Sequence, residues 1–220
     1  MIKCSIFDLD GTLLNTISTI THYVNRALTT YSIEQITEDE CKYFVGTGAR
    51  ELIKKALASK DITDCETFDK VFSTYTELYN SAPLYLTDVY DGIPEMIDSL
   101  KKRGIKLAVL SNKPDLPTGR VVETFFSGCF DYVSGAKEGI ALKPSAEGVF
   151  PILEYLGVSP EECAWIGDTA TDILTGINAG IALKIGVLWG FRGRFELENA
   201  GADLIVAHPK EILDGVLNFD

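Results

Sequence analysis

The chain has 220 residues, of which 46% are hydrophobic and 24% charged, and this composition excludes disordered and fibrous proteins. A chain of this length can bury a core without disulfide or metal staples. Its 20 Lys and Arg against 32 Asp and Glu give a net charge of −12, which argues against nucleic acid and anionic membranes as partners. An anionic substrate would need a local cation.

The cysteines favour a reducing compartment. There are five, scattered along the chain without a CxxC pair, a pattern typical of free thiols rather than a disulfide framework or zinc site. The sequence has no signal-peptide pattern and no apolar run long enough to span a bilayer. We therefore expect a cytoplasmic protein without a membrane partner.

Strands and helices are predicted to alternate along most of the chain. Short apolar runs that end in polar residues predict buried strands at 4–7, 105–110, 164–166, 181–187 and 203–206. Apolar residues at helical spacing predict helices over 93–100 and 149–156, each followed by a glycine stop at Gly104 or Gly157. This alternation predicts an α/β fold with a parallel sheet wrapped by helices.

One interval departs from this rhythm. The segment between Asp10 and Ser111 is about three times longer than the roughly thirty residues that a crossover unit needs. Three apolar stripes at helical spacing lie in it, starting at Ile17, Leu52 and Phe68. We expect an all-helical domain at 16–81 inserted into a core formed by 1–15 and 82–220.

The first polar cluster follows the first predicted strand, in the segment Asp8-Leu9-Asp10-Gly11-Thr12. Gly11 lets the chain turn at the strand exit, so both acids can face one pocket. An ordinary Asp-Gly turn is the alternative interpretation. Two carboxylates directly after a buried strand are, however, costlier than a turn needs.

Three further clusters fall at later strand or loop ends. In Ser111-Asn112-Lys113-Pro114, the hydroxyl at the strand end suits an oxygen-rich anion next to free backbone N–H groups, or else caps a helix. A lone lysine such as Lys143 is usually a solvated surface residue, and only the other clusters make it a candidate site residue. Asp168 ends a strand and Asp172 lies one helical turn later, so both can point at one site, unless Asp168 caps that helix.

Together the clusters predict a site for phosphoryl chemistry, because the carboxyl ends of parallel strands meet at one edge of the sheet. Four carboxylates need a cation, and oxygen ligands select Mg²⁺ over zinc. That cation, a lysine and a hydroxyl can neutralise a phosphoryl group. One carboxylate can then act as nucleophile and a neighbour as acid and base.

With these motifs in order, the chain resembles the haloacid-dehalogenase superfamily of phosphatases, and most closely its phosphoglycolate phosphatase group. Asp8–Thr12, Ser111, Lys143 and the pair Asp168 and Asp172 match the four motifs of that superfamily. The resemblance implies a Rossmann-like core with an inserted helical cap. Val45–Arg50 is similar to the glycine-rich cap loop of the phosphoglycolate phosphatases, which makes Arg50 a candidate substrate contact; a surface arginine is the alternative.

The resemblance also implies roles for single residues. Asp8 would attack phosphorus, and Asp10 would protonate the leaving oxygen and later deprotonate water. The Mg²⁺ ligands would be Asp8, the Asp10 carbonyl, Asp168 and Asp172, the last directly or through water. The phosphoryl oxygens would be held by Ser111, Lys143 and backbone donors near Thr12 and Asn112.

Several functions share this pattern. The expected one is Mg²⁺-dependent hydrolysis of a small phosphorylated metabolite, similar to phosphoglycolate. Asp10 argues against dehalogenation, because dehalogenating relatives do not have this acid. Sugar phosphomutases share all four motifs, and pyrophosphate is a further possible substrate. A phospho-accepting signalling module combines similar residues, but the cap-sized insertion and the second acid argue against it.

Overall fold

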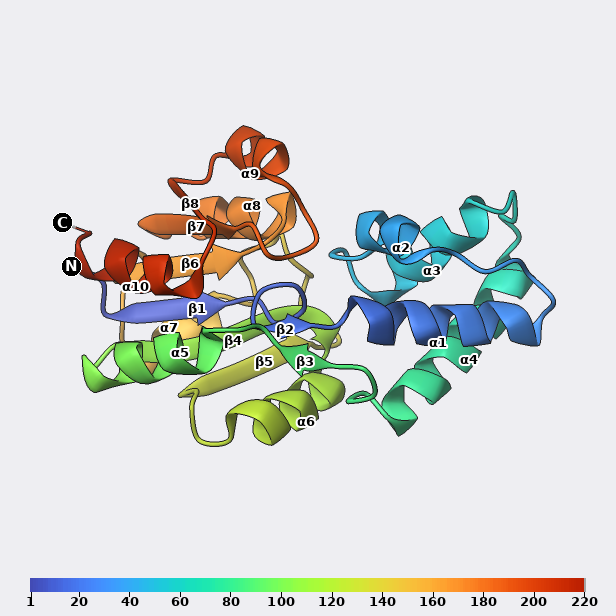
Figure 1. The fold of residues 1–220 in the computed structure, drawn as a ribbon, viewed down its shortest axis with the longest axis horizontal. Helices are drawn as coiled ribbons and strands as arrows, with labels where there is room; N and C mark the ends of the chain where they lie inside the picture. Colours follow the sequence, from blue (N-terminus) through green and yellow to red (C-terminus); the bar gives the residue numbers. More distant parts are fainter. Residues whose placement is uncertain (220) are drawn as a thin grey trace. The chain divides into compact units, whose positions relative to one another are not determined.

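The structure is a computed structural model that describes residues 1–219 and divides the chain into two compact units. The first unit contains Met1–Asn15 and the chain from Val89 onward, and the second is Thr16–Asp88. Figure 1 shows the sheet in the first unit and only helices and loops in most of the second.

A six-stranded sheet forms the centre of the first unit, in the order β5-β4-β1-β6-β7-β8, as far as residues 1–219 are concerned. Every pair of neighbours is parallel. After β5 at one edge, the chain returns across the sheet to place β6 beside β1. Such a switch point is where open α/β sheets bind ligands. The strands are β1 Cys4–Phe7, β4 Lys106–Pro114, β5 Tyr132–Ala136, β6 Cys163–Gly167, β7 Leu183–Val187 and β8 Leu204–Val206.

Helices cover both faces of this sheet because its strands are apolar on both sides. Phe7 and Ile166 pack with α5, α6 and α10, whereas Ile6 and Trp165 pack with α7 on the opposite face. α8 follows β6 and α9 follows β7 (Figure 1). The helices are α5 Ile93–Lys102, α6 Asp115–Phe126, α7 Phe150–Leu156, α8 Ala170–Asn178, α9 Arg194–Ala200 and α10 Pro209–Leu217.

The predicted fold class is confirmed, with two differences in the strands. The edge strand β5 was not predicted, because its sequence Tyr-Val-Ser-Gly-Ala has no run of apolar residues. The second predicted strand ends at Leu110, but β4 continues in extended backbone to Pro114, with a change of register to β5 in between. The predicted glycine stops do adopt left-handed backbone, at φ 76° for Gly104 and 60° for Gly157.

The second unit is built from amphipathic helices that bury their apolar stripes against one another. Its described helices are α1 Ile17–Thr30, α2 Glu38–Phe44, α3 Ala49–Ala58 and α4 Cys65–Ser81. The short strands β2 Leu14–Asn15 and β3 Asp88–Val89 pair where the chain passes from one unit to the other.

This unit extends to Asp88, beyond the end predicted at residue 81. The segment after α4 is tied back to α1 by side-chain hydrogen bonds. Tyr23 Oη donates to the Ala82 carbonyl at 2.9 Å, and Thr19 Oγ1 donates to the Tyr85 carbonyl at 2.6 Å. Such bonds between residues far apart in sequence leave no periodic signal. Within residues 1–219, no helix is both long and apolar enough to cross a membrane.

Candidate active site

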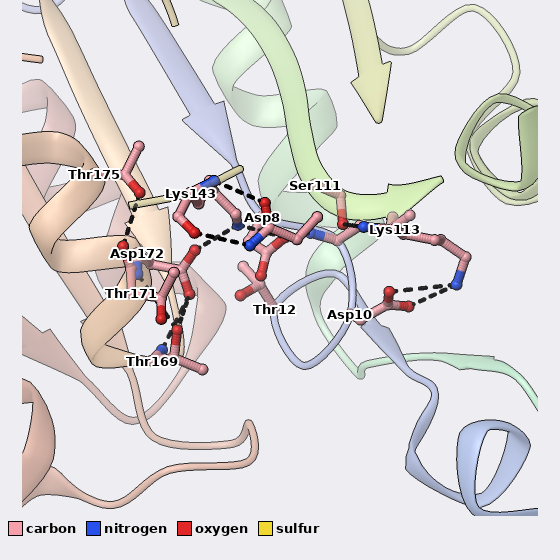
Figure 2. A network of polar contacts seen from close by, with 12 residues as sticks. Asp8, Asp10, Thr12, Ser111, Lys113, Lys143, Thr169, Thr171, Asp172 and Thr175 are labelled. Carbon is pink, nitrogen blue, oxygen red and sulfur yellow. Dashed lines mark hydrogen bonds and ion pairs between the residues drawn. The ribbon is translucent and has the colours of Figure 1, made fainter. Parts of the chain in front are cut away.

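The predicted catalytic residues of the core gather at the carboxyl edge of the sheet (Figure 2). The register explains why: Phe7, the last residue of β1, pairs with Ile166 of β6 and Val109 of β4. The residues that follow, Asp8 on one strand and Asp168 on another, therefore leave the sheet side by side. All of these residues belong to the first unit.

Three carboxylates form the centre of the site. Asp8, Asp168 and Asp172 each offer an oxygen, and these oxygens lie within 4.8 Å of one another. Asp168 and Asp172 are fully buried, and Asp8 is 8% exposed. The Asp10 side chain points away from this cluster (Figure 2), so any contribution from Asp10 to a metal would come from its backbone, as the resemblance implies.

Lys143 provides a positive charge at this cluster. Its Nζ lies 2.8 Å from Asp8 Oδ1 and 2.6 Å from Asp172 Oδ1, and its side chain is 3% exposed. Burial by itself would lower the pKa of this amine, but the carboxylates of Asp172 and Asp8 outweigh it and raise the pKa above its usual range. Lys143 is therefore a permanently charged partner and not a solvated surface lysine.

The single positive charge of Lys143 does not neutralise the negative charges of three carboxylates. Burial raises the pKa of Asp8 to about 7, helped by the charge of Asp172 and opposed by Lys143. Burial and the charges of Asp172 and Asp8 also raise the pKa of Asp168 well above its usual range. Buried carboxylates that repel one another in this way fit a divalent cation, and an all-oxygen donor set fits Mg²⁺.

These pKa values make the effect of Mg²⁺ on stability depend on pH. Because the pKa of Asp8 is raised on folding, the metal-free chain loses stability as the pH rises from about 4 to 7. Mg²⁺ would bind the deprotonated carboxylates, so the stabilisation that it provides should grow over the same window. Mg²⁺ at a hundred times its Kd should raise Tm by roughly 5–10 °C at pH 8. At the same Mg²⁺ concentration, differential scanning fluorimetry should show a much smaller rise in Tm at pH 5. An equal rise in Tm at both pH values would contradict this expectation.

The side chain of Asp168 is held from two directions. Thr12 Oγ1 donates to Oδ1 at 3.1 Å, and the backbone N–H of Phe191 donates to Oδ2 at 2.8 Å. Two glycines make this approach possible. A Cβ on Gly11, at φ 89°, would lie 2.4 Å from Asp168 Oδ2, and one on Gly190 would lie 2.3 Å from Asp168 Cβ.

Asp172 is fixed by the start of α8. It occupies the third helical position, where Oδ2 accepts from the Thr169 N–H at 3.1 Å and its hydroxyl at 2.7 Å. In return, Thr169 Oγ1 accepts from the Asp172 N–H, which completes a capping box. The helix cap is thus Thr169 and not Asp168, and the Asp168 carboxylate faces the acidic cluster instead.

The Asn112 side chain orients Lys143. Its Nδ2 donates to the Lys143 carbonyl at 3.1 Å, and its Oδ1 accepts from the Lys143 N–H at 2.8 Å. This reciprocal pair uses both ends of the side-chain amide. A contribution of the Asn112 backbone N–H to phosphate binding, as the resemblance implies, would leave this pair intact.

Ser111 lies inside the extended end of β4, and α6 begins only at Asp115. The alternative interpretation of Ser111 as a helix cap is therefore wrong. Its Oγ accepts from the Lys113 N–H at 3.2 Å. The same lysine reaches Asp10, with Nζ at 2.9 Å from Oδ1 and 3.3 Å from Oδ2. The sequence predicts no role for Lys113, although it belongs to the cluster Ser111-Asn112-Lys113-Pro114.

Arg50, the candidate substrate contact, lies in α3 of the helical unit. Its guanidinium is 4.9 Å from the ring centroids of both Phe68 and Phe72, which stack on each other. Cation–π contacts with two rings orient the guanidinium without neutralising its charge. Its role in substrate binding stays a prediction.

Comparison with known proteins places the chain in a family. Residues 5–185 match the family model of haloacid dehalogenase-like hydrolases. The chain is 32% identical to a phosphoglycolate phosphatase of Aquifex aeolicus, over 94% of this chain and 93% of that protein. It is 29% identical to a phosphoglycolate phosphatase of Psychrobacter arcticus, over 95% of this chain and 90% of the relative.

A crystal structure of a protein from Lactobacillus delbrueckii subsp. bulgaricus aligns with a TM-score of 0.94 and 30% identity, over 99% of both chains. The matches thus cover both the core and the inserted helices. The chain belongs to the haloacid dehalogenase-like hydrolase family.

Proposed function

We propose that this protein is a Mg²⁺-dependent phosphatase that hydrolyses a small phosphate monoester, similar to phosphoglycolate, through an aspartyl-phosphate on Asp8. The observation that carries the proposal is the buried carboxylate of Asp8, 2.8 Å from Lys143 and grouped with Asp168 and Asp172. The names of the two relatives support the same class of substrate.

The metal would be held by carboxylates of the acidic cluster. Asp8 and Asp168 would bind it directly, with the Asp10 carbonyl, and Asp172 would contribute directly or through water. Both carboxylate oxygens of Asp172 already accept hydrogen bonds, Oδ1 from Lys143 and Oδ2 from Thr169. When bound, Mg²⁺ would neutralise charge on the phosphoryl oxygens and keep Asp8 ionised.

In the first step, a carboxylate oxygen of Asp8 attacks phosphorus and the bond to the ester oxygen breaks. Asp8 Oδ1 already accepts from Lys143 Nζ and, at 2.7 Å, from the Leu9 N–H, so we assign the attack to Oδ2. Asp10 gives a proton to the leaving oxygen. Ser111, Lys143 and backbone N–H groups near Thr12 and Asn112 hold the phosphoryl oxygens.

In the second step, Asp10 takes a proton from water, and the resulting oxygen nucleophile attacks phosphorus in the aspartyl-phosphate. The bond between phosphorus and Asp8 breaks, inorganic phosphate leaves and the Asp8 carboxylate is restored. The same group thus serves as acid and then as base, so each turnover returns it to its starting state.

We propose that the helical unit is the cap that selects the substrate and that Arg50 contributes to this selection. The five cysteines all lie within residues 1–219 and are free thiols. Because free thiols are typical of a reducing compartment, the protein is proposed to act in the cytoplasm. No nucleic-acid or membrane partner is proposed.

The function is tested by a hydrolysis screen with Mg²⁺ over small phosphate monoesters, bisphosphorylated sugars and pyrophosphate. We expect the largest kcat/KM for a small monoester such as phosphoglycolate. Conversion of a sugar phosphate without net release of phosphate would identify a phosphomutase instead, and preference for pyrophosphate would identify a pyrophosphatase. A phosphoaspartate that persists for minutes without turnover would identify a signalling module.

Asp168→Asn should sharply raise the Mg²⁺ concentration needed for activity, because it removes a charged ligand from the cluster. We expect a rise in half-saturating Mg²⁺ of about 10- to 100-fold, with saturating metal restoring part of kcat. A Mg²⁺ titration of initial rates measures this. Glu147→Gln, an exposed acid whose carboxylate accepts from the Ala141 N–H, is the control and should leave the titration unchanged.

A further inference from the structure

Lys113 and Asp10 form an ion pair that the chemistry described above does not use. Lys113 is near the end of β4 and Asp10 follows β1, so residues about a hundred positions apart meet at one sheet edge (Figure 2). Nζ lies within hydrogen-bond distance of both carboxylate oxygens, at 2.9 and 3.3 Å. The lysine side chain is 4% exposed and that of Asp10 is 18% exposed.

The backbone of Lys113 is held as firmly as its side chain. Its N–H donates to Ser111 Oγ, and its carbonyl accepts from Thr118 Oγ1 of α6 at 3.2 Å. β5 approaches so closely that a Cβ on Gly135 would lie 2.5 Å from the Lys113 carbonyl oxygen. Contacts from β4, α6 and β5 thus fix the position from which this ammonium group reaches Asp10.

A surface lysine would not need such an arrangement. Burying an ammonium group is costly unless it is paired, and removing one partner of a buried pair leaves the other charge uncompensated. Two contacts on one carboxylate also restrict rotation of the Asp10 side chain. A group that transfers protons twice per turnover works only if its oxygens stay within reach of the reacting atoms.

We propose that Lys113 is a positioning residue that holds the Asp10 carboxylate in place for both proton transfers. This inference rests on the role of Asp10 in the proposed function. It differs from a second interpretation, in which Lys113 binds an anionic group of the substrate directly. The two interpretations predict different dependences on the leaving group, which makes them separable by experiment.

The experiment compares kcat/KM of Lys113→Met for an alkyl phosphate and for p-nitrophenyl phosphate. kcat/KM includes only the steps up to loss of the leaving group, and p-nitrophenolate leaves without a proton. If Lys113 acts through Asp10, the value for the alkyl ester should fall by roughly 10- to 100-fold, a part of what one proton transfer contributes. The value for p-nitrophenyl phosphate should change by less than about threefold.

The ratio of these two values is independent of the fraction of folded protein, so a less stable variant still gives an answer. Lys113→Arg keeps a cation that can contact both carboxylate oxygens and should restore most of the ratio. Lys184→Met is the matched control. Lys184 is also largely buried and pairs with an acid, Asp203 at 2.8 Å, but lies at the start of β7 and should leave the ratio unchanged.

A double variant separates the inference from the proposed function. If Asp10→Asn itself alters the ratio but Lys113→Met causes no further loss in the Asp10→Asn background, Lys113 acts through Asp10. Equal losses for both esters, or a full additional loss in that background, would overturn the inference in favour of direct substrate binding. If Asp10→Asn leaves the ratio at its wild-type value, the assignment of Asp10 fails, and the proposed function fails at that point.

Discussion

Asp8→Asn should abolish turnover, with kcat reduced by roughly 10⁵-fold or more, the scale expected when the nucleophile of a covalent mechanism is removed. The substitution keeps the size of the side chain but replaces a charged oxygen by an amide nitrogen. It also removes one of the three carboxylates of the acidic cluster. The variant should therefore lose the covalent intermediate and bind Mg²⁺ more weakly.

Loss of fold is a poor explanation for such a result, because a neutral amide at this position would avoid both the burial of a charge and its repulsion by Asp172, which raise the pKa of Asp8. Metal-free Asp8→Asn should unfold at a Tm equal to or above that of the wild type at pH 8. Asp131→Asn is a matched control outside the site, since Asp131 Oδ2 accepts from the Leu107 N–H near the start of β4. It should keep wild-type kcat. Turnover by Asp8→Asn within tenfold of the wild type would exclude Asp8 as the nucleophile.

The second large effect is expected for Asp10→Asn. Each proton transfer is worth roughly 10²–10⁴-fold, and the variant loses one in each chemical step. The nucleophile and the backbone carbonyl of residue 10 remain. With p-nitrophenyl phosphate the first step needs no proton on the leaving group, so it should survive better than hydrolysis of the aspartyl-phosphate.

Asp10→Asn should therefore release a burst of p-nitrophenolate equal to the enzyme concentration and then turn over slowly. Rapid-quench kinetics with this ester measure the burst, and intact-protein mass shows whether a phosphoryl group stays on the chain. A variant that accumulates no phosphoryl group and slows equally for all esters would contradict the assignment of Asp10. If Asp8→Asn retains a phosphoryl group and Asp10→Asn does not, the roles of the two aspartates are reversed.

The sequence predicts the part of this molecule that depends on local pattern. Buried strands such as β1 and β6 are short apolar runs, and the polar residues that follow them identify the edge of the sheet where ligands bind. The order of the strands then brings Asp8 and Asp168 together without further information. The inserted helices are predictable for the same reason, because their apolar stripes repeat at helical spacing.

What the sequence does not predict depends on contacts between distant segments. The ion pair between Lys113 and Asp10 forms only because β4 continues beyond Leu110 in extended backbone. The donor to Asp168 Oδ2 is a backbone N–H, that of Phe191, and a backbone donor has no signature in the side-chain pattern. The requirement for glycine at position 190 likewise becomes visible only when its neighbours in space are known.

The most direct test of the proposed mechanism is to trap the phosphoryl group on the wild-type chain. The enzyme is mixed with Mg²⁺ and excess substrate, quenched in acid during steady-state turnover and digested, and the peptides are analysed by mass spectrometry. We expect one phosphoryl group on the peptide that contains Asp8, lost after treatment with hydroxylamine and absent from Asp8→Asn. A phosphoryl group on any other residue, or rapid turnover with none trapped at the earliest quench times, would contradict it.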